Sequence, residues 1–245
     1  MDFDRFTAIS FDCYGTLIDW ESGILPTLRA VLTNHGHGQS LVDADILELY
    51  GEFEAQAESG PYQRYRDVLQ SVVRAFADHF LFEASSEEVR SLPESVRGWL
   101  PFADTVAALQ QLRKCYKLAI ISNIDDDLLA ETRKHLGVEF DALITAEQAG
   151  SYKPAINNFQ MALRRLALPP SQLLHSGQSV YHDIVPARSL GISTVWVNRK
   201  SARPGVGAVR TSAAPSAERL PDLEVPDLAS LAGHVAAVFR PTGAG

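Results

Sequence analysis

The feature that most constrains the fold of this chain is a repeated order of short apolar segments and helical patterns. The apolar segments cover residues 7–11, 116–121, 141–145, 173–174 and 194–197. They are nearly continuous apolar runs, which is typical of strands buried on both faces of a parallel sheet. Helical patterns lie between them, at about 103–114, 127–136 and 156–167. Because strands that alternate with helices form right-handed βαβ units, the sequence predicts an α/β fold with a Rossmann-like, doubly wound parallel sheet.

The stretch after the first strand breaks this alternation. Residues 19–98 show helical periodicity without strand patterns, with apolar residues at Ile24, Leu28, Val31, Ile46, Leu49, Phe53, Tyr65, Val68 and Val72. We therefore expect a core made of residues 1–18 and 99–245 and an inserted helical cap of residues 19–98. A last helix is predicted at about 226–239. The Arg-, Pro-, Ala-, Ser- and Gly-rich segment 199–222 predicts a mobile surface loop.

Composition limits the class of protein. The chain has 245 residues, of which 46% are hydrophobic, so it can bury a sizeable core. Its 30 acidic and 22 basic residues give a net charge of −8, which disfavours nucleic acid as a partner. No apolar run approaches the roughly 18 residues that a membrane-spanning helix needs. The charged first residues and the absence of a CxxC pair among the two cysteines favour a cytoplasmic protein without disulfide bonds.

Polar residues follow each of the first four predicted strands. They are Asp12, Tyr14 and Thr16 after the first, Ser122 and Asn123 after the second, Lys153 after the third, and Ser179, His182 and Asp183 after the fourth. Since the carboxyl ends of parallel strands meet at one edge of a sheet, we expect the side chains of Asp12, Thr16, Ser122, Asn123, Lys153 and Asp183 to converge there.

Two other features have structural interpretations. The acidic run 125–127 predicts the capped and charged first turn of a helix. Trp20 and Trp99 lie near the two junctions between core and cap and are predicted to be packing residues.

The polar residues also carry a family resemblance. The order of DCYGT at 12–16, Ser122-Asn123, Lys153-Pro154 and a final Asp183 resembles the four motifs of the haloacid-dehalogenase superfamily of hydrolases. The resemblance implies that Asp12 is a nucleophile, and that Thr16, Lys153 and Asp183 complete the catalytic group. It covers most of the chain, including the position of the cap.

Tyr14 separates two branches of that superfamily. The phosphatases carry DxDxT, in which the second Asp protonates the leaving group, and usually an Asp where Gln178 stands here. A phenol with a pKa near 10 replaces that acid poorly. The DxYGT form is similar to the L-2-haloacid dehalogenases, which need no metal. The implied function is hydrolysis of a small 2-substituted carboxylic acid through an Asp12 ester, with no cofactor. If Mg²⁺ binds, the expected ligands are Asp12, the Tyr14 backbone carbonyl and Asp183.

The resemblance is weaker around the substrate. We predict that a small anionic substrate contacts Tyr14, Ser122, Asn123, Ser179 and His182. Dehalogenases of this type place a cap Arg near the halide, but the corresponding stretch 49–53 contains none, so Arg64, or else Arg66, is predicted to replace it. Phe159 and Val180 stand where those enzymes have Tyr and Asn.

Two alternatives stay open for the function. One is a Mg²⁺-dependent phosphatase of the same superfamily, and the other is a non-catalytic metabolite-binding descendant of the fold. Proteins of this kind are often homodimers, and the sequence leaves the oligomeric state undecided.

Overall fold

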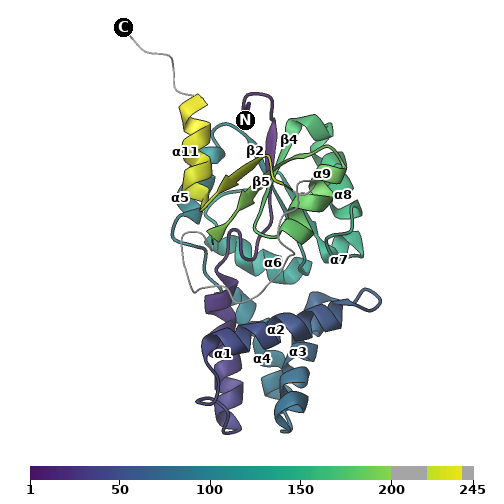
Figure 1. The fold of residues 1–245 in the computed structure, drawn as a ribbon. Helices are drawn as coiled ribbons and strands as arrows, with labels where there is room; N and C mark the ends of the chain where they lie inside the picture. Colours follow the sequence, from purple (N-terminus) through teal and green to yellow (C-terminus); the bar gives the residue numbers. More distant parts are fainter. Residues whose placement is uncertain (200–219, 239–245) are drawn as a thin grey trace.

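The core of the molecule is a six-stranded sheet with the strand order β3-β2-β1-β4-β5-β6 (Figure 1). The computed structural model describes residues 1–199 and 220–238. The strands are β1 (Ala8–Phe11), β2 (Lys117–Ser122), β3 (Ala142–Thr145), β4 (Leu173–Gly177), β5 (Ser193–Val197) and β6 (Leu223–Val225). Every neighbouring pair is parallel. The predicted fold class is therefore confirmed. The sheet also gains β6, which the sequence did not predict, and most of the predicted mobile loop, 200–219, lies outside the described residues.

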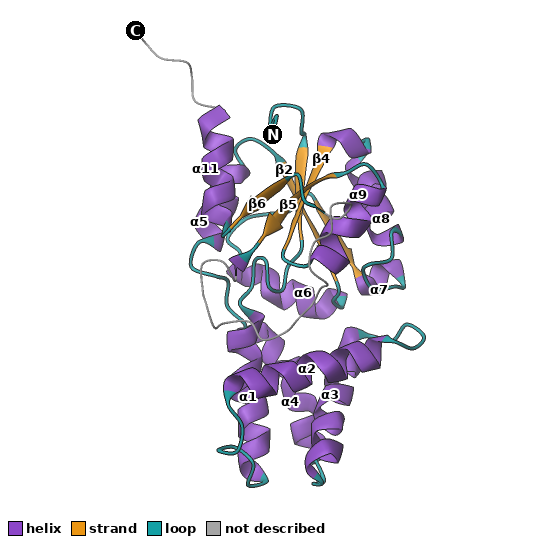
Figure 2. Ribbon diagram, in the orientation of Figure 1, coloured by secondary structure: helices purple, strands orange, loops and turns teal. Residues whose placement is uncertain are grey.

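Helices cover both faces of the sheet (Figure 2). The helices of this part are α5 (Thr105–Leu112), α6 (Asp126–Thr132), α7 (Ala146–Ala149), α8 (Asn157–Leu166), α9 (Val185–Ser189) and α11 (Leu228–Val238). Successive side chains of a strand point to opposite faces. Accordingly Ile9 and Phe11 of β1 share a core with Leu109 of α5, whereas Ala8 shares the second core with Phe159 of α8. Burial on both faces explains why the strand sequences are continuously apolar.

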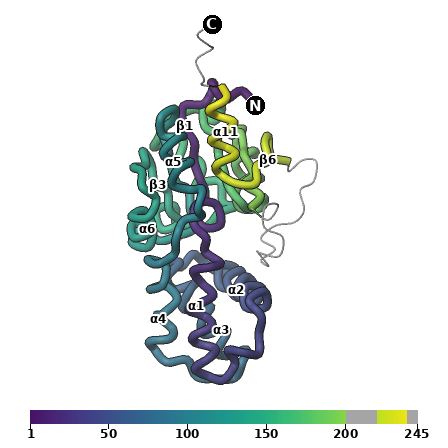
Figure 3. Tube along the Cα trace, turned by 90° about the vertical axis from the view of Figure 1, so that its left-hand side faces the viewer, coloured from purple at the N-terminus to yellow at the C-terminus, as the bar shows by residue number. Residues whose placement is uncertain are grey.

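A second layer of helices lies beyond the carboxyl ends of the strands (Figures 1 and 3). It consists of α1 (Trp20–Asn34), α2 (Asp43–Glu58), α3 (Tyr65–Phe80) and α4 (Ser86–Ser95), which form the inserted helical cap. The predicted periodic residues pack inside it, since Leu28, Val68 and Val72 are almost completely buried. The sequence predicted the first three helices and missed α4. None of the described helices is long and apolar enough to cross a membrane.

The core supplies the N-terminal cap of α3. The residue preceding this helix, Arg64, makes no side-chain capping bond. Instead the carboxylate of Asp125, which follows β2, accepts hydrogen bonds from the backbone N–H groups of Tyr65 and Arg66, both at 2.9 Å. The first N–H groups of a helix have no partner within it. A core residue thus satisfies a helix terminus of the cap and joins the two layers.

The strand order places a topological switch at β1. This strand pairs with β2 on one side and β4 on the other, so the chain connections diverge from its carboxyl end. In open α/β sheets a crevice forms at such a point and holds the ligand. The first residue beyond β1 is Asp12.

Candidate active site

Asp12 is held at the end of β1 by backbone and side-chain hydrogen bonds. Its backbone N–H donates to the Ser176 carbonyl at 3.0 Å, and its Oδ2 accepts from the Thr16 hydroxyl at 2.8 Å. The chain reverses at Gly15, whose φ of +92° is a conformation that other residues rarely adopt. This turn brings Thr16 back to Asp12. The Asp12 carboxylate is fixed in orientation and keeps 8% of its residue surface exposed.

Lys153 links the two carboxylates of the site. Its Nζ donates to Asp12 Oδ1 at 2.8 Å, to Asp183 Oδ1 at 2.6 Å and to the Ile121 carbonyl at 2.9 Å. An ammonium group has three hydrogens, so all its donors are used. The Lys153 backbone is clamped by Asn123, whose side-chain Oδ1 accepts from the Lys153 N–H at 2.7 Å while Nδ2 donates to the Lys153 carbonyl at 3.2 Å.

Asp183 is a positioning residue for this lysine. Its Oδ1 also lies 3.4 Å from His175 Nε2, and its Oδ2 accepts from the Ser179 N–H at 3.2 Å. The carboxylate packs against β4 at Gly177, where an added Cβ would lie 2.6 Å from Asp183 Cβ. Only glycine fits this approach. Both oxygens of Asp183 are therefore occupied inside the protein.

The buried charges shift one another's pKa values. Burial raises the pKa of Asp12, and the Lys153 charge and the Thr16 hydrogen bond oppose this shift. Burial alone would lower the pKa of Lys153, but Asp12 and Asp183 outweigh it and the pKa is raised. Burial likewise opposes the ionised form of Asp183, yet Lys153 holds the pKa of that carboxyl well below its ordinary value. Lys153 is consequently a permanent cation that favours the carboxylate form of both partners.

This donor set suits Mg²⁺ poorly. Mg²⁺ prefers near-octahedral oxygen ligands, usually with carboxylates among them. The site offers Asp12 and Asp183, but the oxygens of Asp183 are already bonded to Lys153, His175 and the Ser179 backbone. Among residues 1–199 and 220–238 no group of three or more His, Cys, Asp or Glu is arranged to hold a metal. The amide of Gln178 stands where phosphatases have a further acid.

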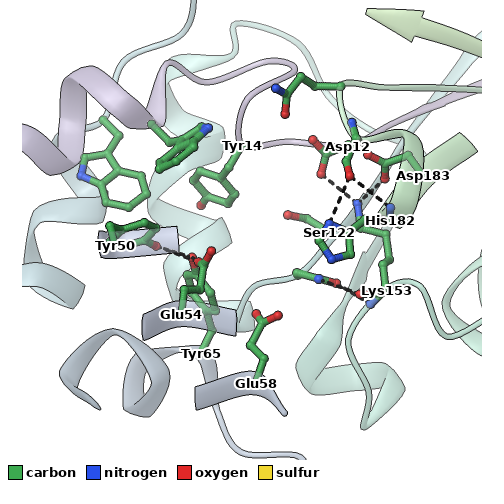
Figure 4. Close-up of a pocket in the computed structure, with 15 residues that line it drawn as sticks. Asp12, Tyr14, Tyr50, Glu54, Glu58, Tyr65, Ser122, Lys153, His182 and Asp183 are labelled. Carbon is green, nitrogen blue, oxygen red and sulfur yellow. Dashed lines mark hydrogen bonds and ion pairs between the residues drawn. The ribbon is translucent and has the colours of Figure 1, made fainter. Parts of the chain in front are cut away.

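Asp12 opens into a cavity of about 100 Å³ between the core and the cap (Figure 4). The core side is lined by the predicted Ser122, Asn123, Lys153, Ser179, His182 and Asp183, together with Gln178. Tyr14 and residues at and beyond the junctions of the cap complete the wall: Trp20, Tyr50, Glu54, Glu58, Tyr65 and Trp99. Trp20 and Trp99, predicted to be packing residues, line the cavity as well. The remainder of the cap wall was not predicted from the sequence, although Tyr50, Glu54 and Glu58 recur at the helical spacing of one face of α2.

The remaining predicted substrate residues differ in their availability. The Tyr14 hydroxyl is 2.7 Å from Thr132 Oγ1, and burial raises the pKa of Tyr14 well above its usual range, so it is not a proton donor for a leaving group. His182 Nδ1 lies 3.2 Å from Ser179 Oγ, and burial lowers the pKa of His182 to about 4, which keeps the imidazole neutral at pH 7. The buried Ser122 Oγ has no hydrogen-bond partner among the described residues.

Arg64 lies elsewhere, contrary to prediction. Its guanidinium forms ion pairs with Asp125, Asp127 and Glu147 at 3.0–3.6 Å, and its side chain is 45% exposed. Arg66 pairs with Asp127 at 2.7 Å. Neither residue lines the cavity. The acidic run 125–127 does begin α6 as predicted, but its carboxylates also attract these two arginines and anchor the start of α3.

Comparisons with known proteins agree with this geometry. The model of the haloacid dehalogenase-like hydrolase family matches residues 6–191. The (S)-2-haloacid dehalogenase H-109 of Pseudomonas putida is 27% identical over 202 residues, which cover 79% of this chain and 86% of the relative. A glyceraldehyde 3-phosphate phosphatase of Methanothermobacter thermautotrophicus is 29% identical over 196 residues, covering 78% and 85%. The crystal structure of the L-2-haloacid dehalogenase PA0810 superposes with a TM-score of 0.78 at 26% identity, covering 95% of this chain and 99% of that one. The protein described here therefore belongs to the haloacid dehalogenase-like hydrolases.

Proposed function

We propose that this hydrolase cleaves a small 2-substituted carboxylic acid, as a 2-haloacid dehalogenase does, through a covalent ester at Asp12. The observation that carries the proposal is the pairing of an oriented Asp12 carboxylate with a phenol, Tyr14, that is engaged with Thr132 and cannot supply a proton. A leaving group that departs as a stable anion needs no proton. Halide meets this requirement, whereas an alkoxide does not.

In the first half-reaction an Asp12 oxygen attacks C2 of the substrate from the side opposite the leaving group. The new C–O bond forms as the C–halogen bond breaks, and the halogen leaves with the bonding electrons. Lys153 and Thr16 fix the carboxylate for this approach, since each donates to one of its oxygens. Preorganised orientation of this kind lowers the entropic part of the barrier.

In the second half-reaction water adds to the carbonyl carbon of the Asp12 ester. The same Lys153 and Thr16 donors lie at the oxygens on which negative charge develops, and so they stabilise the tetrahedral intermediate. His182 has a neutral imidazole in the cavity wall and is proposed to orient the attacking water by hydrogen bonding. Cleavage of the ester bond returns Asp12 as a carboxylate and releases a 2-hydroxy acid and one proton. No step requires a metal ion.

Ser122 and Asn123 are proposed to contact the substrate carboxylate. Ser122 supplies a buried hydroxyl without a protein partner, and a buried polar group without a partner is costly. Asn123 lies beside it in the cavity wall, but its side chain is committed to the Lys153 backbone. We therefore assign Ser122 to substrate binding and Asn123 mainly to positioning Lys153.

Single-turnover labelling tests the proposal. Excess protein is incubated with (S)-2-chloropropionate in H₂¹⁸O, and the peptide that contains Asp12 is analysed by mass spectrometry. We expect one ¹⁸O in this peptide and release of one chloride for each ester formed. Label in the hydroxy acid with none in the Asp12 peptide would disprove the ester. If 2-haloacids are inert while another substrate labels Asp12, the halide is wrong and the ester mechanism stands.

The phosphatase alternative is favoured by similarity to phosphate-cleaving relatives, among them the glyceraldehyde 3-phosphate phosphatase at 29% identity and a pyrophosphatase of Bacillus velezensis at 28% identity. It predicts Mg²⁺-dependent release of phosphate from small phosphate esters, which a panel assay with and without chelator would detect. The non-catalytic alternative predicts that Asp12→Asn changes neither turnover nor labelling with any substrate. Tyr14, Gln178 and the hydrogen-bonded Asp183 make the phosphatase outcome unexpected, and the Asp12 carboxylate held by Lys153 and Thr16 beside the cavity argues against a non-catalytic role.

A further inference from the structure

The wall of the cavity opposite Asp12 is acidic. The carboxyl groups of Glu54 and Glu58, one turn apart on α2, both point toward the cavity (Figure 4). Residues four apart on a helix are surface neighbours, so two carboxylates in this relation repel each other. Most carboxylates face bulk water, and a pair of carboxylates that faces a cavity is costly unless a partner compensates the charge.

Two hydrogen bonds orient the Glu54 carboxyl group as an acceptor. The Tyr50 hydroxyl donates to Glu54 Oε1 at 2.7 Å, and the Tyr65 hydroxyl donates to the same oxygen. Burial raises the pKa of Glu54, but these two donations oppose the shift. The two donated hydrogen bonds leave Glu54 Oε2 without a partner among the described residues. The two tyrosines therefore orient an acceptor whose second oxygen can serve a ligand.

Glu58 has no hydrogen bond or ion pair among the described residues. Burial, followed by the charge of Glu54, raises the pKa of Glu58 to about 9, against the opposing effect of Lys153. A proton thus compensates one of the two carboxylates when the cavity holds no cation. A bound cation that displaces this proton would restore an ion pair to both groups.

The charges around the cavity sum to a negative value. Asp12, Asp183 and Glu54 oppose the single ammonium of Lys153, and His182 is neutral. Arg64 and Arg66 lie outside the lining. A simple anion such as a short haloacid would enter against this field, whereas a positively charged group would be attracted to the α2 wall. Ser122, which is 1% exposed and has no side-chain hydrogen-bond partner among the described residues, lines the same cavity.

We infer that the substrate carries a positively charged amine, which binds between Glu54 and Glu58 while its reactive carbon faces Asp12. This inference rests on the proposed function, because it specifies the substrate of the Asp12 ester reaction. The substrate class is then a zwitterion: a carboxylate directed to the Ser122 side, and an ammonium group at the far end of a short chain. Ammonium donates three hydrogen bonds, which matches the open oxygens of the two carboxyl groups.

Binding of unreactive probes tests the amine site separately from the chemistry. Calorimetry compares 3-aminopropionate, 4-aminobutyrate and 5-aminopentanoate with butyrate, pentanoate and hexanoate, in which a methyl group replaces the ammonium. We expect at least one amine to bind about tenfold tighter than its methyl counterpart, equivalent to about 1.4 kcal/mol. The preference should disappear in the Glu54→Gln/Glu58→Gln variant and should fall in Glu58→Gln alone, which leaves the Glu54 carboxylate and its hydrogen bonds from Tyr50 and Tyr65 intact.

The matched control is Glu48→Gln/Glu52→Gln. These residues have the same spacing on α2 but are exposed to solvent, so removing their charge tests for a long-range effect. We expect the control to keep the full preference for the amine. Thermal melts establish that each variant is folded. Equal or weaker binding of every amine, undetectable binding of all probes, or a preference that survives in both glutamine variants would overturn the inference.

Labelling of Asp12 distinguishes failure of the inference from failure of the proposed function. (S)-6-Amino-2-chlorohexanoate and (S)-2-chloroheptanoate are compared in H₂¹⁸O as above. Equal labelling by both substrates, with no preference for amine probes, keeps the ester mechanism and removes the amine site. Amine binding that depends on Glu58, with no label at Asp12 from any substrate, keeps the amine site and removes the ester mechanism.

Discussion

At the residue scale, the site contains side chains that hold Asp12 in place and one side chain, Ser122, that is open to a ligand. Lys153 and Thr16 spend their donors on Asp12, Asp183 and the backbone, and they have no hydrogen left for a substrate. Ser122 Oγ is buried and has no partner among the described residues. Substitutions at these positions should therefore have different kinetic signatures.

Ser122→Ala should weaken substrate binding without weakening the fold. No described hydrogen bond is lost, so the free energy of unfolding should change by less than about 0.5 kcal/mol. Loss of one substrate hydrogen bond should raise KM about tenfold. Steady-state kinetics and denaturant unfolding check both values. The matched control is Ser176→Ala, which removes another buried, unpartnered hydroxyl that does not line the cavity. An equal KM change in both variants would contradict the assignment.

At the scale of secondary-structure elements, two cap helices depend on identifiable capping groups. The α3 N-terminus is capped by Asp125 of the core, and α4 by its own Ser85 and Glu88. A helix terminus whose N–H groups lose their acceptor is destabilised by about 1 kcal/mol. Both caps can be tested without touching the active site.

Asp125→Ala should loosen the start of α3 and its attachment to the core. We expect hydrogen exchange of the Tyr65 and Arg66 amides to accelerate about tenfold, since removal of a capping acceptor costs about 1–2 kcal/mol. Mass spectrometry of the peptide around 62–70 measures this. Asp67→Ala, at an exposed acid in the first turn of α3, is the control and should have a smaller effect. Unchanged exchange in Asp125→Ala would show that the two hydrogen bonds contribute little.

The α4 cap should give a pH-dependent stability. The Ser85 N–H and the Asn34 side chain donate to Glu88, and they lower the pKa of Glu88 to about 2. A lowered folded-state pKa stabilises the fold above the ordinary value, and this contribution is lost as the pH falls through about 2. We expect Glu88→Gln to reduce the free energy of unfolding by about 1 kcal/mol at pH 7 and by clearly less at pH 2, where about half of the Glu88 carboxylates are protonated. Denaturant unfolding at both pH values checks the difference. A constant deficit would exclude an ionic origin.

How well elements could be predicted depended on the range of the interactions that define them. The apolar composition of residues 7–11 and 116–121 is sufficient to predict buried strands. Asp12 and Ser122, which follow these runs, lie at the carboxyl edge of the sheet as predicted. β6 has three residues and exists through its pairing with β5, which local sequence does not encode. Arg64 was misassigned for the same reason: its partners Asp127 and Glu147 are distant in sequence.

The residues of the cap wall form a pattern that is visible in the sequence, but their environment is not. Tyr50, Glu54 and Glu58 form a regular helical stripe, but an amphipathic pattern does not say whether its polar positions face solvent or an internal cavity. Only the docking of α2 over the carboxyl ends of the strands turns these residues inward.

At the scale of the whole molecule, the proposal makes catalysis independent of metal ions. Lys153 supplies the positive charge beside Asp12, and both oxygens of Asp183 already accept hydrogen bonds within the protein. Dialysis against EDTA should leave kcat/KM for the productive substrate unchanged, and added Mg²⁺ should not raise it. Loss of activity on chelation with recovery on Mg²⁺ addition would instead favour the phosphatase alternative.

The two walls of the cavity are encoded differently in the gene: the residues around Asp12 are dispersed along the sequence, whereas the acidic residues of the cap wall lie in one contiguous stretch. The groups that hold and activate Asp12 are scattered from position 12 to position 183 and interlock through Lys153. The acidic wall that faces them derives from a single stretch between Tyr50 and Tyr65. A short cassette covering this stretch can thus be randomised or exchanged between homologues while the reaction centre stays intact. New substrate preferences can arise, in evolution or in the laboratory, by changes within the 16 consecutive codons from Tyr50 to Tyr65, about one-fifteenth of the 245-residue chain.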